Sequence, residues 1–157
     1  MDHEKIIVLD FGGQYNQLIA RKSPGMQRVL RSAAVYAVSG GDQGKEPEGI
    51  IFTGGPNSVY DETSPRYANE IYEMGVPILG ICYGAQLMAY QLGGKVETAP
   101  VSEYGRTEVD IDNKDGLFQD VADKTICWMS HTDYISEAPE GFEVTAHTPV
   151  CPEPHGK

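Results

Sequence analysis

One cysteine has neighbours that could turn its thiol into a nucleophile. Residues 77–86 read Pro-Ile-Leu-Gly-Ile-Cys-Tyr-Gly-Ala-Gln, an apolar run that leads to a cysteine between two glycines. This pattern is typical of a nucleophile elbow, a tight strand-to-helix turn in which Gly80 and Gly84 allow close approach of the backbone. The N-terminus of the following helix would favour the thiolate of Cys82, the form that attacks a carbonyl carbon. The sequence therefore predicts a reactive thiol here rather than a buried structural cysteine.

The other cysteines and the glycine-rich stretch have no comparable pattern. Cys127 lies in an apolar run and Cys151 precedes a proline, and neither has glycines around it, so we interpret both as structural. Residues 40–45 resemble a phosphate-binding P-loop, but its spacing is one residue short. Glu46 also stands where a Ser or Thr should bind the metal. We therefore predict neither a phosphate site nor a metal site.

The composition excludes several classes of function. The chain has 157 residues, of which 40% are hydrophobic and 22% charged, which predicts one globular domain with a proper core. A formal net charge of −11 makes nucleic acids and anionic membranes poor partners. No apolar run is long enough to span a membrane, and residues 1–5 do not resemble a signal peptide. Together with three cysteines, these features predict a cytoplasmic protein with reduced thiols.

Apolar runs alternate with helical segments in the first two thirds of the chain. Strands are predicted at 6–10, 49–53 and 77–81, and helices from about Tyr15, over 64–74 and over 85–92. This alternation predicts an α/β fold with a doubly wound, mostly parallel sheet flanked by helices. The loops that follow the three strands should then share the carboxyl edge of the sheet, where binding sites form. Shorter strands are predicted at 107–111, 125–129 and 142–147.

Several stretches together resemble the class I glutamine amidotransferase domain of GMP synthetase. They are residues 8–15, 53–60, 80–86, 91–94, 103–105 and 128–133. The elbow alone is similar to that of class I amidotransferases in general. The motifs Asp-Phe-Gly-Gly-Gln-Tyr at 10–15 and Met-Ser-His-Thr-Asp at 129–133 indicate the GMP synthetase branch. The resemblance covers about residues 5–22 and 47–152.

The resemblance implies a glutaminase. In the family, the cysteine that Cys82 matches attacks the side-chain amide of glutamine, forms a γ-glutamyl thioester and releases ammonia. The backbone N–H groups of Gly55 and Tyr83 match the donors that hold the oxyanion, each worth ~3 kcal/mol in the transition state. The implied substrate-binding residues are Asn57, Gln86, Ser130, His131, Thr132 and Asp133. For residues 130–133, a plain polar loop after a strand is the alternative interpretation.

The resemblance also implies cofactors and partners. The glutaminase part needs L-glutamine and no cofactor. ATP and Mg would belong to a synthetase (ATP-pyrophosphatase) domain, which is absent from this sequence and is expected as a partner domain or subunit that receives the ammonia. No nucleic acid and no membrane is expected as a partner.

The sequence departs from the family at its end. The family's general base is a histidine in a Phe-His-Pro-Glu-Val segment, and the chain is expected to stop before that segment, as a partial amidotransferase domain over 1–157. His131 is not assigned as the base. An inactive truncated fragment, or a non-catalytic glutamine-binding or regulatory subunit, is therefore the alternative to a glutaminase. A redox or thiol-hydrolase protein is a third candidate, against which Gln86 and the turn at 54–56 argue.

Residues 23–46 form the second departure. They do not continue the family pattern, which resumes at Pro47 with the expected length. We interpret the segment as a frameshift product, with a divergent insertion as the alternative. On the frameshift hypothesis the second strand and its helix lose their intended pattern, which compromises the core, and this segment should be the least ordered part of the protein apart from the termini.

Overall fold

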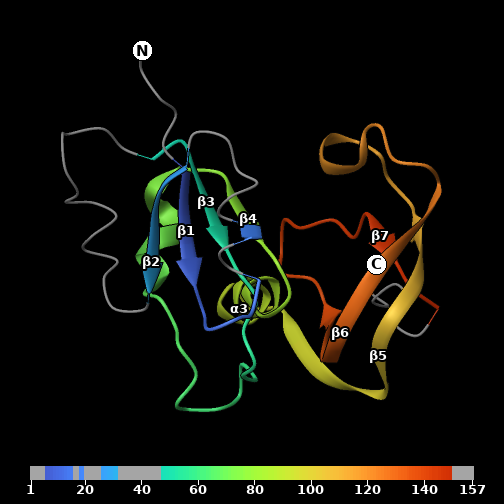
Figure 1. Ribbon diagram of the computed structural model, residues 1–157, viewed down its shortest axis with the longest axis horizontal. Helices are drawn as coiled ribbons and strands as arrows, with labels where there is room; N and C mark the ends of the chain where they lie inside the picture. Colours follow the sequence, from blue (N-terminus) through green and yellow to red (C-terminus); the bar gives the residue numbers. More distant parts are fainter. Residues whose placement is uncertain (1–5, 16–17, 20–25, 32–46, 150–157) are drawn as a thin grey trace. The chain divides into compact units, whose positions relative to one another are not determined.

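The chain divides into two compact units, residues 1–88 and 89–157. The computed structural model describes residues 6–15, 18–19, 26–31 and 47–149 (Figure 1). No helix among these residues is both apolar enough and long enough to cross a membrane.

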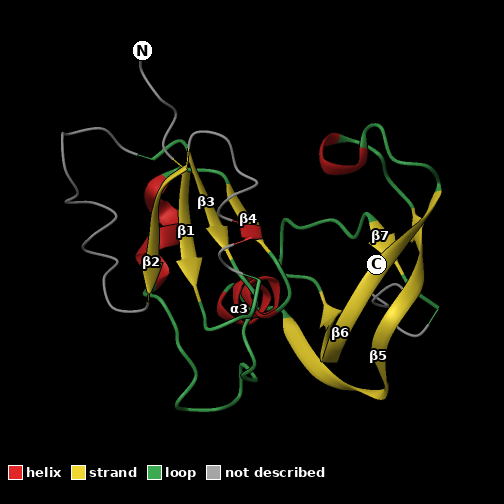
Figure 2. Ribbon diagram, viewed as in Figure 1, coloured by secondary structure: helices red, strands yellow, loops and turns green. Residues whose placement is uncertain are grey.

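The first unit is built on a parallel sheet. Its four strands have the order β2-β1-β3-β4 and all neighbouring pairs are parallel (Figure 2). The strands are β1 (Ile6–Asp10), β2 (Met26–Arg31), β3 (Gly49–Phe52) and β4 (Ile78–Gly80). Val8, Leu9 and Phe52 are fully buried, as expected for strands covered on both faces. The predicted parallel α/β sheet is confirmed.

Part of the atypical segment forms a strand. Met26–Arg31 is β2, which pairs with β1 in parallel along its length, with one register shift between Ile6 and Ile7. The backbone of these residues thus forms the second strand, even though the family's sequence pattern is interrupted there. Strand pairing uses main-chain hydrogen bonds, which do not require the family's side-chain pattern. Residues 23–25 and 32–46 lie outside the described residues, so the expectation that they are poorly ordered stays a prediction.

The helices of the first unit depart from the predictions mainly in their boundaries. The N–H groups of Leu18 and Ile19 donate to the carbonyl of Tyr15, so a helical turn begins there as predicted. Helix α3 (Tyr83–Gln91) begins two residues before the predicted start at Ala85. The helix predicted over 64–74 is wrong for residues 64–68, because the helical part is the short 3₁₀ helix η1 (Asn69–Met74). The Ser64 hydroxyl donates to the carbonyl of Ser58 at 2.6 Å instead of capping a helix.

The second unit is an antiparallel sheet with the order β6-β5-β7. Its strands are β5 (Lys95–Ile111), β6 (Lys124–Glu137) and β7 (Ala146–His147), and the short 3₁₀ helix η2 (Gly116–Phe118) lies between β5 and β6. The strands predicted at 107–111 and 125–129 are therefore parts of a much longer hairpin. The strand predicted at 142–147 is correct only for its last two residues.

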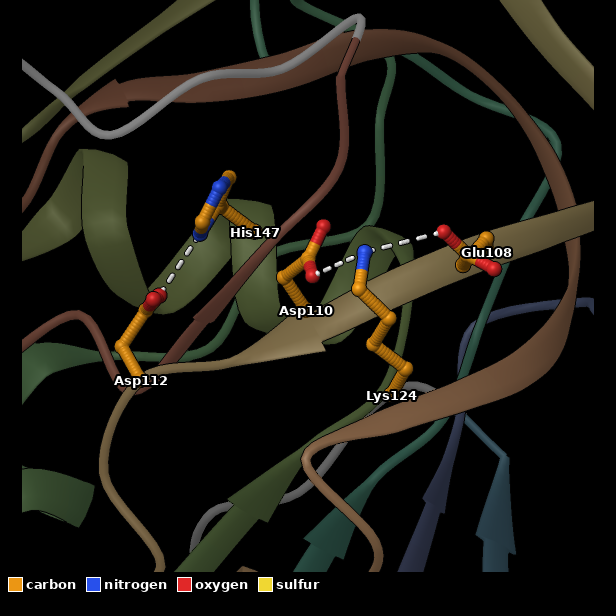
Figure 3. Close-up of polar contacts among 5 residues, drawn as sticks. All are labelled: Glu108, Asp110, Asp112, Lys124 and His147. Atoms are coloured by element: carbon orange, nitrogen blue, oxygen red, sulfur yellow. Dashed lines mark hydrogen bonds and ion pairs between the residues drawn. The ribbon is translucent and has the colours of Figure 1, made fainter.

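Charged pairs across this sheet explain why apolar periodicity underestimates it. Lys124 contacts Glu108 at 3.1 Å and Asp110 at 2.7 Å, and the imidazole of His147 lies 2.7 Å from the carboxylate of Asp112 (Figure 3). Lys124 and Glu108 are exposed and Asp110, Asp112 and His147 are half-buried, so solvent weakens these ion pairs and each adds little to stability. They favour the register of the strands without leaving an apolar pattern in the sequence.

The close packing of Gly84 gives a stability prediction. A Cβ at this position would lie 2.5 Å from the carbonyl oxygen of Phe52. We expect Gly84→Ala to lower the free energy of unfolding by about 2 kcal/mol or more, because backbone must move to admit the methyl group. Gly49→Ala is the matched control, since its nearest atom would be 3.9 Å away, and it should change stability by less than about 0.5 kcal/mol. Equal effects in urea unfolding would contradict this packing.

Candidate active site

Cys82 sits on a strained turn between β4 and α3. Its φ is +52°, and it is the non-glycine residue with positive φ in the described part of the chain. Such a conformation costs on the order of 1–2 kcal/mol for an L-residue. Gly80 permits the turn, because a Cβ there would lie 2.7 Å from the Cα of Ala85. The side chain of Cys82 is exposed, so the predicted elbow presents a free thiol.

Thr53, directly after β3, joins the three loops at the carboxyl edge of the sheet. Its hydroxyl donates to the carbonyl of Leu9 at 2.8 Å and accepts the N–H of Phe11 at 3.3 Å. Its carbonyl accepts the N–H of Gly84 at 3.1 Å. Thr53 is fully buried, so these bonds are shielded from water. The sequence analysis missed this residue, although a threonine at the end of a buried apolar strand was a visible signal.

The loop after β3 passes directly beside the thiol. A Cβ on Gly54 would lie 3.4 Å from the Cβ of Cys82 and 3.8 Å from its Sγ. Gly55 lies against the loop after β1, where a Cβ would be 2.5 Å from the carbonyl oxygen of Phe11. In the described part of the chain, no backbone hydrogen bond of the loops and turns uses the N–H group of Gly55 or of Tyr83 as its donor. The predicted oxyanion donors and the predicted nucleophile therefore lie at one edge of the sheet.

Aromatic side chains support this edge from the core. The ring of Phe11 lies 5.2 Å from that of Tyr67, 5.3 Å from that of Tyr83 and 5.6 Å from that of Phe52, measured between centroids. Burial, with a smaller contribution from the charge of Asp10, raises the pKa of Tyr67 to about 12. The cluster therefore stays neutral at physiological pH and provides a firm base for the loops.

Two predicted substrate-binding residues belong to the same unit. Asn57 is half-buried in the loop after β3. Gln86 is buried on α3, one turn after the nucleophile, and its N–H donates to the carbonyl of Cys82 at 3.1 Å. The start of α3 thus fixes Gln86 relative to the thiol.

The other predicted binding residues lie on β6 in the second unit. Ser130, His131, Thr132 and Asp133 belong to this strand, so the alternative interpretation of a plain polar loop is wrong. The Thr132 hydroxyl lies 3.0 Å from that of Tyr104, and Asp133 accepts a hydrogen bond from Thr98 at 2.9 Å. The partner strand β5 is irregular between Thr98 and Glu103, opposite this segment.

A buried carboxylate holds His131. Its Nε2 lies 3.2 Å from one oxygen of Glu103, and the Thr148 hydroxyl donates to the other at 2.7 Å. The contact with the carboxylate places a proton on Nε2. Nδ1 of His131 is buried and has no hydrogen-bond partner among the described residues. Sequence reasoning did not predict Glu103 as part of this group.

The described residues hold no group of three or more His, Cys, Asp or Glu side chains that could bind a metal ion. At the edge of the parallel sheet, the exposed thiol of Cys82 lies beside the loop that carries Gly54 and Gly55 and directly before Tyr83. This arrangement can attack an acyl carbon and stabilise the resulting oxyanion.

Comparison with known proteins agrees with this chemistry. The sequence model of the family "Glutamine amidotransferase class-I" matches residues 7–155. The chain belongs to this family.

Relatives and solved structures extend the comparison. The chain is 58% identical over 154 residues to "GMP synthase [glutamine-hydrolyzing]" of Clostridium botulinum (strain Alaska E43 / Type E3), covering 97% of this chain and 30% of that protein. It is 53% identical over 152 residues to the protein of the same name from Lachnospira eligens, covering 97% and 29%. A glutamine amidotransferase structure from Thermotoga maritima matches with a TM-score of 0.70 at 20% identity, over 96% of this chain and 69% of that one. The chain thus spans about 30% of the length of the curated relatives it matches.

The role of Thr53 gives a second prediction. We expect Thr53→Val to lower the free energy of unfolding by about 2 kcal/mol, because the shape is kept while the buried N–H of Phe11 loses its acceptor. The control is Thr63→Val, whose hydroxyl contacts Asp61 at the surface and should matter by less than about 0.5 kcal/mol. Chemical denaturation measures both variants. A Thr53 variant as stable as the control would contradict the central position of Thr53.

Proposed function

We propose that this chain is the glutaminase part of a GMP synthase, which releases ammonia from glutamine for the conversion of XMP to GMP. The observation that carries the proposal is the exposed thiol of Cys82 on a strained elbow, directly before Tyr83 and beside Gly54 in the loop that also carries Gly55. Membership of the class I glutamine amidotransferases supports the reaction. The curated relatives at 53–58% identity support the GMP synthase branch.

The proposed reaction proceeds in two steps. The thiolate of Cys82 attacks the side-chain amide carbon of glutamine, and the N–H groups of Gly55 and Tyr83 stabilise the oxyanion. The amide nitrogen takes up the proton that the thiol gave up, the C–N bond breaks and ammonia leaves, and a γ-glutamyl thioester remains on the sulfur. Water hydrolyses the thioester, which yields glutamate and restores the thiol. We assign no described residue as the base, since Nε2 of His131 is bound to Glu103 and its Nδ1 is buried.

The remaining predicted residues are proposed to hold the amino-acid end of glutamine. Asn57 and Gln86 supply side-chain amides, which can bind both the ammonium and the carboxylate of the substrate. Residues 130–133 lie on β6 of the second unit, and their role in binding glutamine is proposed from the resemblance alone; His131, Thr132 and Asp133 are already held by Glu103, Tyr104 and Thr98. Such prior ordering lowers the entropy lost on binding.

The ammonia needs an acceptor. Because the chain spans about 30% of its curated relatives, we propose that a synthetase (ATP-pyrophosphatase) domain or subunit is its partner. ATP and Mg would bind to that partner, while the glutaminase part uses no cofactor. We propose a cytoplasmic location, which free thiols such as those of Cys82 and Cys127 favour.

Glutamine hydrolysis by the purified chain tests the proposal directly. We expect turnover of glutamine to glutamate, and we expect Cys82→Ala to lower it at least about a thousandfold, because the nucleophile is lost. Cys127→Ser is the matched control, since Cys127 is also an exposed free thiol, and it should keep the wild-type rate. Coupled detection of glutamate and of ammonia measures all three proteins.

Two results would contradict the proposal. Turnover that survives in Cys82→Ala would show that this thiol is not the nucleophile. Absence of turnover in the wild-type chain, with or without the synthetase portion of a Clostridium relative, would show that it is no glutaminase.

A further inference from the structure

The side chain of Tyr83 has a contact that its proposed role as a backbone donor does not require. Tyr83 is buried, and its ring packs against that of Phe11. Its hydroxyl donates a hydrogen bond of 2.8 Å to the carbonyl oxygen of Pro65, eighteen residues earlier in the chain. The residue next to the nucleophile is thus tied to a distant loop.

That loop, residues 58–66, is closed by its own hydrogen bonds. The Ser64 hydroxyl and the N–H of Asp61 both donate to the carbonyl of Ser58, at 2.6 and 3.2 Å. The guanidinium of Arg66 donates to the carbonyl of Val59 at 2.6 Å. Val59 is itself fully buried. Because its two ends are bonded together, the segment should move as one body.

The closed segment directly follows the stretch that carries Gly55. Thr53 anchors this stretch at its start, and Gly55 lies against Phe11. The hydroxyl of Tyr83 anchors the chain again within the closed segment, at Pro65. The chain between these anchors holds one of the two proposed oxyanion donors, and Tyr83 itself holds the other.

We propose that the Tyr83 hydroxyl is a positioning group that sets the geometry between the Gly55 and Tyr83 N–H donors. This inference rests on the proposed glutaminase function. Its physical reason is that one residue carries one donor and also restrains the loop that carries the other. Oxyanion stabilisation depends on such preorganised donors, so a loosened loop should slow chemistry more than it weakens substrate binding. Burial raises the pKa of the Tyr83 phenol, so the hydroxyl remains a donor at physiological pH.

Steady-state kinetics of Tyr83→Phe test the inference. The variant keeps the ring and its packing but loses the hydrogen bond. We expect kcat for glutamine to fall about five- to tenfold with KM within about twofold of wild type. Tyr60→Phe is the control, because Tyr60 lies in the same loop with its side chain exposed, and it should match wild type. Alkylation of Cys82 by iodoacetamide, which forms no oxyanion, should proceed at the same rate in all three proteins.

Amide hydrogen exchange supplies a readout that does not depend on activity. In Tyr83→Phe the amides of Asp61 and Ser64, which donate hydrogen bonds within the loop at 58–66, should exchange at least about fivefold faster, while those of Leu9 and Ile50 in β1 and β3 keep their rates. This result in a chain without turnover would refute the proposed function but support the positioning role. Unchanged exchange and unchanged kcat would overturn the inference. Faster exchange throughout the sheet, or equal losses in kcat and alkylation, would overturn it in favour of a general structural role.

Discussion

The hydrogen bonds of Thr53 are the constraint on which the rest of the proposed site depends. One buried residue accepts from the loop after β1, donates to β1 itself and accepts from the elbow through its carbonyl. Parallel strands bring their carboxyl ends to the same edge, but they do not fix how the loops beyond them lie. Thr53 supplies that second level of order, because its bonds tie the end of β1, the loop after β1 and the elbow to the end of β3.

Close packing around these bonds stabilises a conformation that Cys82 would not adopt alone. The positive φ of Cys82 is unfavourable, and it persists because the turn is restrained on both sides. Gly84 lies against Phe52, and Gly55 lies against Phe11, so the elbow and the donor loop both rest on the buried aromatic residues. The same packing that orders the core therefore holds an exposed thiol in a strained position.

Features that apolar periodicity and the spacing of glycines encode could be predicted from the sequence. The buried strands, the parallel sheet, the elbow and the family are confirmed. The roles of the individual site residues remain predictions. Thr53 was missed because its importance depends on partners forty or more residues away. The full length of β5 and β6 was missed because charged pairs such as Lys124 with Asp110, rather than apolar alternation, line these strands. The helix predicted to begin at Ser64 was wrong because the Ser64 hydroxyl bonds to the carbonyl of Ser58 and does not cap a helix.

The central claim is that Cys82 attacks glutamine and carries the glutamyl group. Acid quenching of the wild-type chain during incubation with glutamine, followed by peptide mass spectrometry, tests it most directly. The account predicts one added γ-glutamyl group on the peptide that contains Cys82, removable by hydroxylamine as expected for a thioester. A γ-glutamyl group found on the Cys127 peptide instead, or hydrolysis of glutamine with Cys82 never modified, would contradict the account.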